Sequence, residues 1–145
     1  MRRIQRDSTH EELVKLLTTG DQPIFKEIWR LLQFASGVGI ASGKRRQLVD
    51  SDSGKNIPDT YFSSPGWQGY LHLIAITETG SSEILRNSDR NQDETVSFFE
   101  QYANAGLAII AEKIQTAATP LDALILLALE SESNLPAAPT VTDLI

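Results

Sequence analysis

The sequence contains no cysteine, and this absence removes several classes of protein at once. Scaffolds held by disulfides, zinc sites built from thiolates and enzymes with a cysteine nucleophile are all excluded. Histidine is scarce as well, since His10 and His72 are the two histidines of the chain. Neither has a neighbouring residue at the spacing of a metal-binding motif. We therefore expect the protein to hold no metal ion and no cofactor.

Long hydrophobic runs are also missing. The longest apolar stretch, residues 121–129, is far shorter than the roughly 20 residues that a membrane-spanning helix needs. The N-terminus is basic, but no apolar segment of the kind found in signal peptides follows it. We therefore expect a cytoplasmic protein that has no contact with a membrane.

No catalytic motif is recognisable either. The chain has no Gly-x-Ser-x-Gly sequence, and no pair of carboxylates stands apart from the polar faces of the expected helices. Residues 37–44 look like a phosphate-binding loop, but Val38 stands where that motif has glycine and Arg45 where it has serine or threonine. Tight helix packing explains these small residues better. The sequence therefore favours a non-enzymatic accessory or interaction protein, with no catalytic residue to name.

The residues that are present are typical of one helical domain. Of the 145 residues, 41% are apolar and 22% are charged, which is sufficient for a single core. Apolar residues recur at helical spacing and predict a mainly all-α fold of five to six helices. We place this domain at residues 1–130 and expect residues 131–145, which show little periodicity, to form a flexible tail.

The first half of the chain gives clear helix boundaries. A capping box of Ser8 and Glu11, or of Thr9 and Glu12 one residue later, predicts a first helix that ends at Gly20. A second helix is expected to begin near Pro23 and to end at Gly43. Residues 2–6 fit either a short strand or a loose arm, and the turn-rich residues 47–64 are expected to form a long loop.

The second half is dominated by one long helix, expected at residues 92–117 and expected to form the central pair of the core with the second helix. Before it, a helix begins at residues 64–65, although residues 70–76 fit a buried strand equally well. A helical turn at residues 81–86 and a linker at residues 87–91 follow. A last helix begins at Thr119 and Pro120, with these residues predicted to face inward: Leu121, Leu124, Ile125, Ala128 and Leu129.

Positive charge is concentrated at the start of the chain. Residues 1–46 carry nine basic against five acidic residues, whereas residues 47–145 carry four against fourteen. If the first two helices form a hairpin, two basic clusters meet at one end and bind phosphates of DNA. An ordinary solvated surface is the alternative. The clusters are the DNA-binding candidates: Arg2, Arg3, Arg6, Lys44, Arg45 and Arg46.

Two further interpretations concern assembly. Residues 2–6 followed by two helices are similar to a ribbon-helix-helix DNA binder, in which Ile4 points inward while Arg3 and Gln5 face the groove. Residues 99–107 of the long helix either pack in the core, which the periodicity favours, or form the seam of a homodimer. Small residues at Ala103, Ala105 and Gly106 allow the close approach that such a seam needs.

Two segments of the chain carry a family resemblance. The first is Phe34-Ala35-Ser36-Gly37-Val38-Gly39 with Lys44-Arg45-Arg46, and the second runs from Phe99 to Leu107. Both resemble the Dnd system-associated proteins of type four. The likeness spans residues 8–130, with Ala105-Gly106 where the family has a Gly-Gly pair. It implies a prokaryotic protein associated with DNA phosphorothioation, in which sulfur replaces a non-bridging phosphate oxygen, or with the linked restriction. Proteins of the Dnd system and DNA are the partners that it implies, and it implies no catalytic residues.

Overall fold

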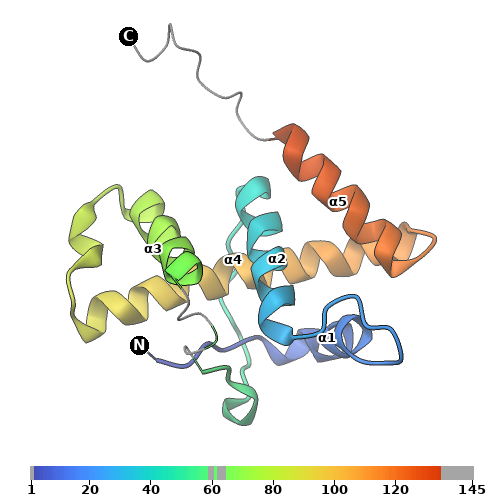
Figure 1. Cartoon of the computed structure of the whole chain (residues 1–145), viewed down its shortest axis with the longest axis horizontal. Coiled ribbons are helices and arrows are strands. Elements are labelled where there is room, and N and C mark those ends of the chain that lie inside the picture. Colours follow the sequence, from blue (N-terminus) through green and yellow to red (C-terminus); the bar gives the residue numbers. More distant parts are fainter. Residues whose placement is uncertain (1, 59–60, 62–64, 135–145) are drawn as a thin grey trace, which may run out of the picture.

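The computed structural model describes residues 2–58, 61 and 65–134, and this part of the chain forms an all-α domain of five α-helices (Figure 1). The longest helix, α4 (Asp89–Thr116), is crossed near its middle by α2 (Ile28–Ser42). On either side of α2, α3 (Pro65–Thr79) and α5 (Pro120–Asn134) pack against α4, while α1 (Glu11–Thr18) packs against α2. The all-α prediction is confirmed, and α2 and α4 form the central pair.

Several helix ends differ from the sequence prediction, and hydrogen bonds explain the differences. The second helix begins at Ile28 rather than near Pro23, because the Phe25 N–H donates to the Leu17 carbonyl and draws the preceding segment away from helical geometry. α4 begins at Asp89, inside the expected linker, because the Ser88 hydroxyl accepts the Asn91 N–H at 3.1 Å.

The remaining comparisons with the sequence prediction concern the first turn, residues 70–76 and the ends of α2 and α5. The first turn, η1 (Ser8–His10), is capped by Asp7, whose carboxylate accepts the Thr9 N–H at 3.0 Å, rather than by Ser8. Residues 70–76 lie within α3 and are helical. α5 continues to Asn134, four residues into the segment expected to be a tail, and residues 135–145 lie outside the described part. Gly43 ends α2 as predicted, in the left-handed conformation with φ 66°.

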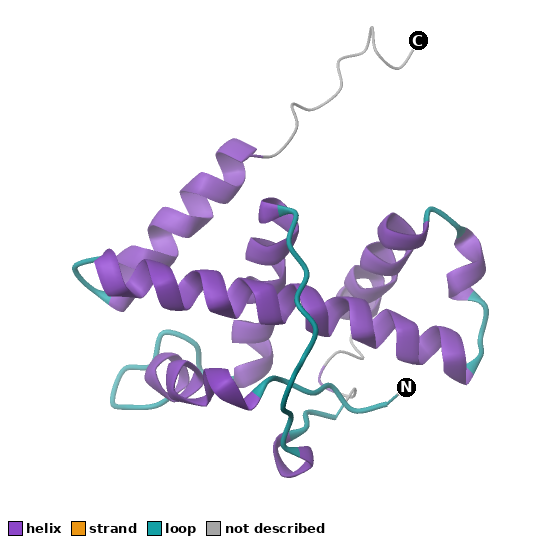
Figure 2. Cartoon of the chain, turned by 180° about the vertical axis from the view of Figure 1, so that it is seen from behind, coloured by secondary structure: helices purple, strands orange, loops and turns teal. Residues whose placement is uncertain are grey.

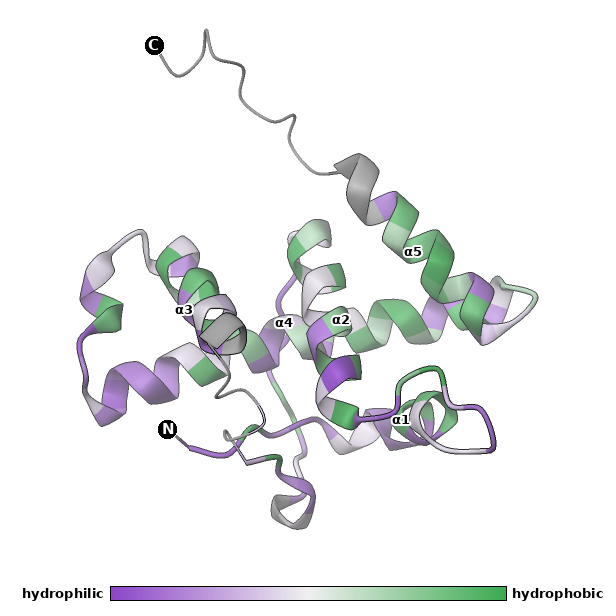
Figure 3. Ribbon diagram, viewed as in Figure 1, coloured by the Kyte–Doolittle hydropathy of each residue, from purple (hydrophilic) through white to green (hydrophobic). Residues whose placement is uncertain are grey.

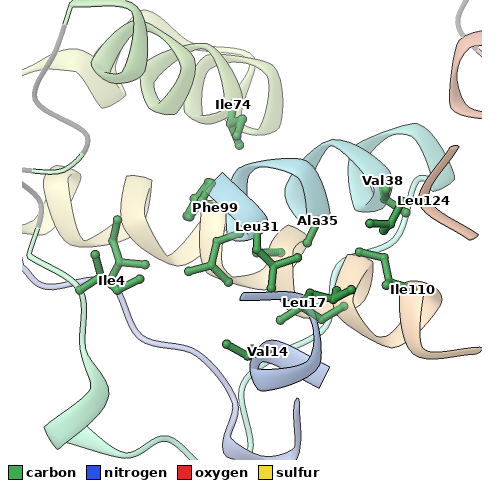
Figure 4. Packing of buried hydrophobic residues seen from close by; sticks show 14 of the residues in the cluster. Ile4, Val14, Leu17, Leu31, Ala35, Val38, Ile74, Phe99, Ile110 and Leu124 are labelled. Carbon is green, nitrogen blue, oxygen red and sulfur yellow. The ribbon is translucent and has the colours of Figure 1, made fainter. Parts of the chain in front are cut away.

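The hydrophobic core lies where α2 crosses α4, and each of the described α-helices contributes to it. Figure 4 shows Phe99 of α4 beside Leu31 of α2, with Ile110 and Leu124 closing the opposite end. Apolar residues recur at helical spacing along the long helix, and over its middle they are almost fully buried: Val96, Phe99, Ala103, Leu107 and Ile110. The core is therefore centred on the crossing of α2 and α4.

The two helices cross at nearly backbone-to-backbone distance. A Cβ atom on Gly106 would lie 1.7 Å from the Ala35 carbonyl oxygen, and one on Gly39 would lie 2.3 Å from the Tyr102 carbonyl oxygen. Only glycine allows such an approach at these positions. The two segments that carry the family resemblance therefore meet each other here. The interpretation of residues 99–107 as core is confirmed, and their small residues pack within the chain.

The N-terminal arm is extended but is not part of a sheet. Ile4 and Asp7 each form one isolated antiparallel bridge, with Ile57 and Ser51 respectively, and the described residues contain no longer strand. Figure 2 shows the segment after α2 crossing α4 and continuing past the arm toward η2 (Ser53–Lys55). The arm thus pairs with its own chain, whereas the ribbon-helix-helix interpretation requires pairing with another copy.

Candidate functional site

Arg2, the first cation of the N-terminal cluster, is held by a carboxylate of α4. Its two terminal nitrogens donate to the Oε2 and Oε1 atoms of Glu100 at 2.9 and 2.6 Å. Glu100 is 5% exposed and also accepts the Gln5 N–H at 2.5 Å. The hydrogen bond to Glu100 is the main cause that raises the pKa of Arg2 above its ordinary value. This pair therefore fixes the N-terminal arm to α4.

Arg6 is used in the same way at the other end of the arm. Its side chain is buried, with Nε 2.6 Å from Glu11 and Nη1 donating to the Lys55 carbonyl at 2.6 Å. The ammonium group of Lys55 also lies 3.3 Å from Glu11. Burial opposes ionisation of Glu11, but Arg6 and Lys55 outweigh it and lower the pKa of this carboxyl. Arg3, by contrast, is exposed and donates to the Asn56 carbonyl at 3.0 Å.

The second cluster, here called the basic loop (Lys44, Arg45 and Arg46), lies against α4. Arg45 is 3.2 Å from Glu78 and stacks on the Phe98 ring, with 5.4 Å between its guanidinium carbon and the ring centroid. Lys44 and Arg46 have exposed side chains and no ion pair with any described residue.

Backbone contacts fix the position of the basic loop. The Arg46 N–H donates to the Gln101 carbonyl at 3.0 Å, and the Asn104 amide donates to the carbonyls of Arg46 and Gln47 at 3.1 Å each. Beside the loop lies an open hollow of about 470 Å³, whose floor includes Ala105 and Ala108 of α4. The loop therefore presents two free cationic side chains from a fixed backbone.

The structure brings parts of the two basic clusters to one turn of α4, rather than to the end of a hairpin. Arg2 contacts Ser97 and Glu100, while Arg45 contacts Phe98 on the neighbouring side of the same turn. Arg6 points away toward α1 and η2. Of the six predicted residues, three are therefore neutralised by carboxylates, and the assignment of DNA contact to all six stays a prediction.

A polar junction joins the arm, η1 and the loop that follows α2. Asp7 accepts hydrogen bonds from the Val49 N–H at 2.8 Å and from the N–H and hydroxyl of Thr9. Burial opposes its ionisation, but these bonds outweigh that effect and lower the pKa of Asp7. Burial lowers the pKa of His10, and Arg46 adds to this effect, while Asn104 and Asp7 oppose it. Within the described residues no group of three His, Cys, Asp or Glu side chains is arranged to hold a metal ion.

On the opposite side of the α2–α4 pair, the outer surface of α2 forms an open groove of about 1160 Å³. Aromatic side chains line much of it, including Phe25, Trp29 and Phe34, and Gly37 lines it without a side chain, so the groove is open at that position. Two cations, Lys26 and Arg30, also line the groove. Apolar linings of this extent are typical of surfaces that bind another molecule.

The outer side of α5 continues this apolar surface. Leu121, Ile125, Leu126 and Leu129 are 45% to 58% exposed, and Ala128 of the same helix lines the groove. Figure 3 shows hydrophobic residues along most of α5. We call the groove together with these four residues the apolar face.

The apolar face was missed by the sequence analysis, and the prediction for α5 was wrong in part. Leu121, Ile125, Ala128 and Leu129 were expected to face inward, but over residues 120–130 of this helix the buried residues are Ala123, Leu124 and Leu127. Apolar residues surround α5 almost completely, so periodicity does not choose one side. The sequence signal for this face was the apolar run itself. A helix with apolar residues on all sides packs one side against its own chain, and its opposite side is then an apolar surface as well.

The comparisons with known proteins identify a family. A family model described as DNA sulphur modification system-associated protein 4 matches residues 3–144. The chain belongs to this family. The resemblance inferred from the two motifs is confirmed, and the family associates the chain with a DNA sulphur modification system. No curated protein and no solved structure matches the chain. None of the helices in the described part has the length and apolar character needed to cross a membrane.

Proposed function

We propose that the chain is a non-enzymatic accessory protein of a DNA sulphur modification system and acts through protein–protein contact at the apolar face. The single observation that carries the proposal is the row of half-exposed apolar residues on α5 beside the α2 groove. Monomeric proteins rarely leave contiguous apolar surface of this kind open to water, because covering it is favourable. The family membership supports the choice of system, because it associates the chain with DNA sulphur modification.

The proposal is tested in cells that carry the modification system. Leu129 is 58% exposed, so Leu129→Glu introduces a charge into the apolar face at little cost to the fold. We expect cells that carry this variant to show the same phosphorothioate content or the same restriction as cells that lack the protein. Leu85→Glu is the matched control, because Leu85 is also exposed and lies in η4 (Ser82–Leu85), at the opposite end of the molecule from α5. Wild-type levels of both activities in the Leu129→Glu strain would contradict the proposal.

A second candidate function is DNA contact by the basic loop. It is favoured by Lys44 and Arg46, whose exposed side chains have no carboxylate partner in the described part of the chain. The test is fluorescence anisotropy with a short duplex, with and without phosphorothioate linkages, over a series of salt concentrations. Each phosphate contact that is removed reduces the slope of log affinity against log salt by about 0.9. The double variant Lys44→Ala/Arg46→Ala should therefore lose about 1.8 from this slope, and an unchanged slope would rule out the basic loop.

A further inference from the structure

We propose that the apolar face is covered by a second copy of this chain. In this two-fold dimer, the outer side of α5 of each copy lies in the α2 groove of the other. The inference rests on the proposed function and deepens it, because it names the partner of the apolar face. Four features of the structure support this arrangement: the anchoring of α5, its length, its charge and its place beside the groove.

The described residues of the chain leave this surface uncovered. Figure 4 shows Leu124 packed near Val38 and Ile110, so the inner side of α5 is anchored to α2 and α4. Leu127 is buried on the same inner side. This anchoring holds Leu121, Ile125 and Leu129 outward, where they are about half exposed within the part of the chain that the structure describes.

The outer side of α5 matches the groove in length. From Leu121 to Leu129 a helix rises about 12 Å at 1.5 Å per residue. The groove follows α2 from Trp29 to Ala41, which corresponds to about 18 Å. The row of Leu121, Ile125 and Leu129, here called the α5 row, therefore fits along the groove. Such packing of one helix face into an apolar groove is a common mode of recognition.

The charges of the two surfaces are complementary. Lys26 and Arg30 line the groove, and no carboxylate belongs to the described residues that line it. The sequence of α5 contains Asp122, Glu130 and Glu132 but no lysine or arginine. Glu130 is paired with Lys113 of α4 and Arg30 with Glu27. Asp122 of α5 and Lys26 of the groove therefore provide the complementary charges, and these favour this pairing over contact between two grooves or two α5 helices.

The position of the two surfaces favours a second copy over an unrelated helix. Ala128 belongs to α5 and also lines the groove, so groove and α5 row adjoin on one face of the molecule. A two-fold axis through this face places both α5 rows in both grooves at once, and the assembly closes. A single foreign helix would fill the groove and leave the outer side of α5 exposed.

Sedimentation equilibrium of the full chain tests the dimer. We expect Leu129→Glu and Gly37→Trp each to raise the dissociation constant of the dimer by about 30-fold or more, the effect typical of a central interface residue. Nothing lies within 4 Å of a Cβ atom at Gly37, so its new side chain blocks the groove without disturbing α2. Leu85→Glu should leave the constant unchanged, and circular dichroism should show equal helix content in all variants.

Cysteine cross-linking then tests which surfaces meet. Because the chain has no cysteine, single substitutions provide unique reactive positions. Under mild oxidation, a mixture of the Gly37→Cys and Leu129→Cys chains should form a disulfide-linked dimer that contains one chain of each kind. A mixture of Leu85→Cys and Leu129→Cys should not form this product.

Each outcome separates this inference from the proposed function. A chain that stays monomeric at high micromolar concentration overturns the dimer. So does a dimer that persists unchanged in both face variants. If Leu129→Glu still abolishes the contribution in cells while the wild-type chain is monomeric, the proposed function holds and a different protein occupies the face. If the dimer forms as described but Leu129→Glu cells behave as wild type, the proposed function fails and the dimer remains.

Discussion

At the scale of single residues, the family motifs serve packing. Gly39 and Gly106 lie where α2 and α4 approach to within backbone contact, and both belong to the segments that carry the family resemblance. Gly37 belongs to the same segment as Gly39 but faces the groove, with open space around it. Neighbouring glycines of one motif therefore have different roles, and substitution separates them.

Gly106→Ala should destabilise the fold strongly, because its methyl group would overlap the Ala35 carbonyl and force the central helices apart. We expect a loss of about 2–3 kcal/mol in the free energy of unfolding, as for other overpacked cores. Gly37→Ala is the matched control and should be neutral or stabilising by up to about 1 kcal/mol, since alanine favours the helix. Urea denaturation measures both changes. Equal stability of the two variants would contradict the close crossing.

His10 makes stability depend on pH in a predictable direction. Burial lowers its pKa in the folded chain, so the unfolded chain binds more protons just below the ordinary value of about 6.5. The free energy of unfolding should therefore fall as the pH drops from 7 toward 5. Asp7 and Glu11 also have lowered pKa values, and the stability that they contribute is lost in a separate, more acidic range below about pH 4.

His10→Gln distinguishes these two ranges. The variant should lose the decline between pH 7 and 5 and keep the decline at lower pH, as followed by thermal unfolding at a series of pH values. A decline of unchanged size between pH 7 and 5 in this variant would show that another group titrates there. The free energy of unfolding falls as the pH drops because the folded state favours the neutral imidazole of His10, so the unfolded state binds more protons.

At the scale of elements, the sequence was sufficient to predict that the helices exist, but not where each one begins or which side of each one is buried. The long helix has a strict apolar stripe, so its buried residues could be predicted, and Gly43 marked the end of α2 because its left-handed conformation suits glycine. The start of α2 could not be predicted, since it depends on a hydrogen bond from Phe25 to Leu17 in another element.

Long-range contacts also decide which basic residues remain available for binding. The charge of these residues was visible in the sequence, but their distant partners were not, because Glu100 is 98 residues from Arg2 and the Lys55 carbonyl is 49 residues from Arg6. The carboxylate of Arg6, Glu11, is by contrast only five residues away. The arm therefore uses two of its three arginines to hold itself in place. A cluster of like charges in a sequence predicts a binding surface only where the fold supplies no carboxylates.

The two sides of α5 predict opposite effects for adjacent residues. Leu124→Ala should cost about 2–4 kcal/mol, because it leaves a cavity beside Val38 and Ile110. Ile125 is 49% exposed, and Ile125→Ala should change stability by less than about 1 kcal/mol. Thermal unfolding at low protein concentration, where association is suppressed, measures both. A larger loss for Ile125→Ala than for Leu124→Ala would mean that α5 packs in a different rotation.

At the scale of the whole molecule, α2 and α4 separate two surfaces of different chemistry. The groove is on the side of α2 that faces away from α4, and the basic loop is on the side of α4 that faces away from α2. One surface is apolar and the other presents free cations. Covering the first surface thus leaves the second accessible, and a two-fold dimer presents two basic loops.

Salt should therefore separate the two activities. Apolar contacts are not screened by ions, whereas contacts to phosphate release counterions and weaken steeply as salt rises. Between 50 and 500 mM salt, we expect the dissociation constant of the dimer to change by less than about tenfold, because few of its contacts are charged. Over the same range, DNA binding through the basic loop should fall much further. Sedimentation equilibrium and fluorescence anisotropy on the same samples give both constants. A parallel fall of the two would mean that the charged residues Lys26 and Arg30, rather than the leucines of α5, carry the assembly, because only a charged interface responds to salt as DNA binding does.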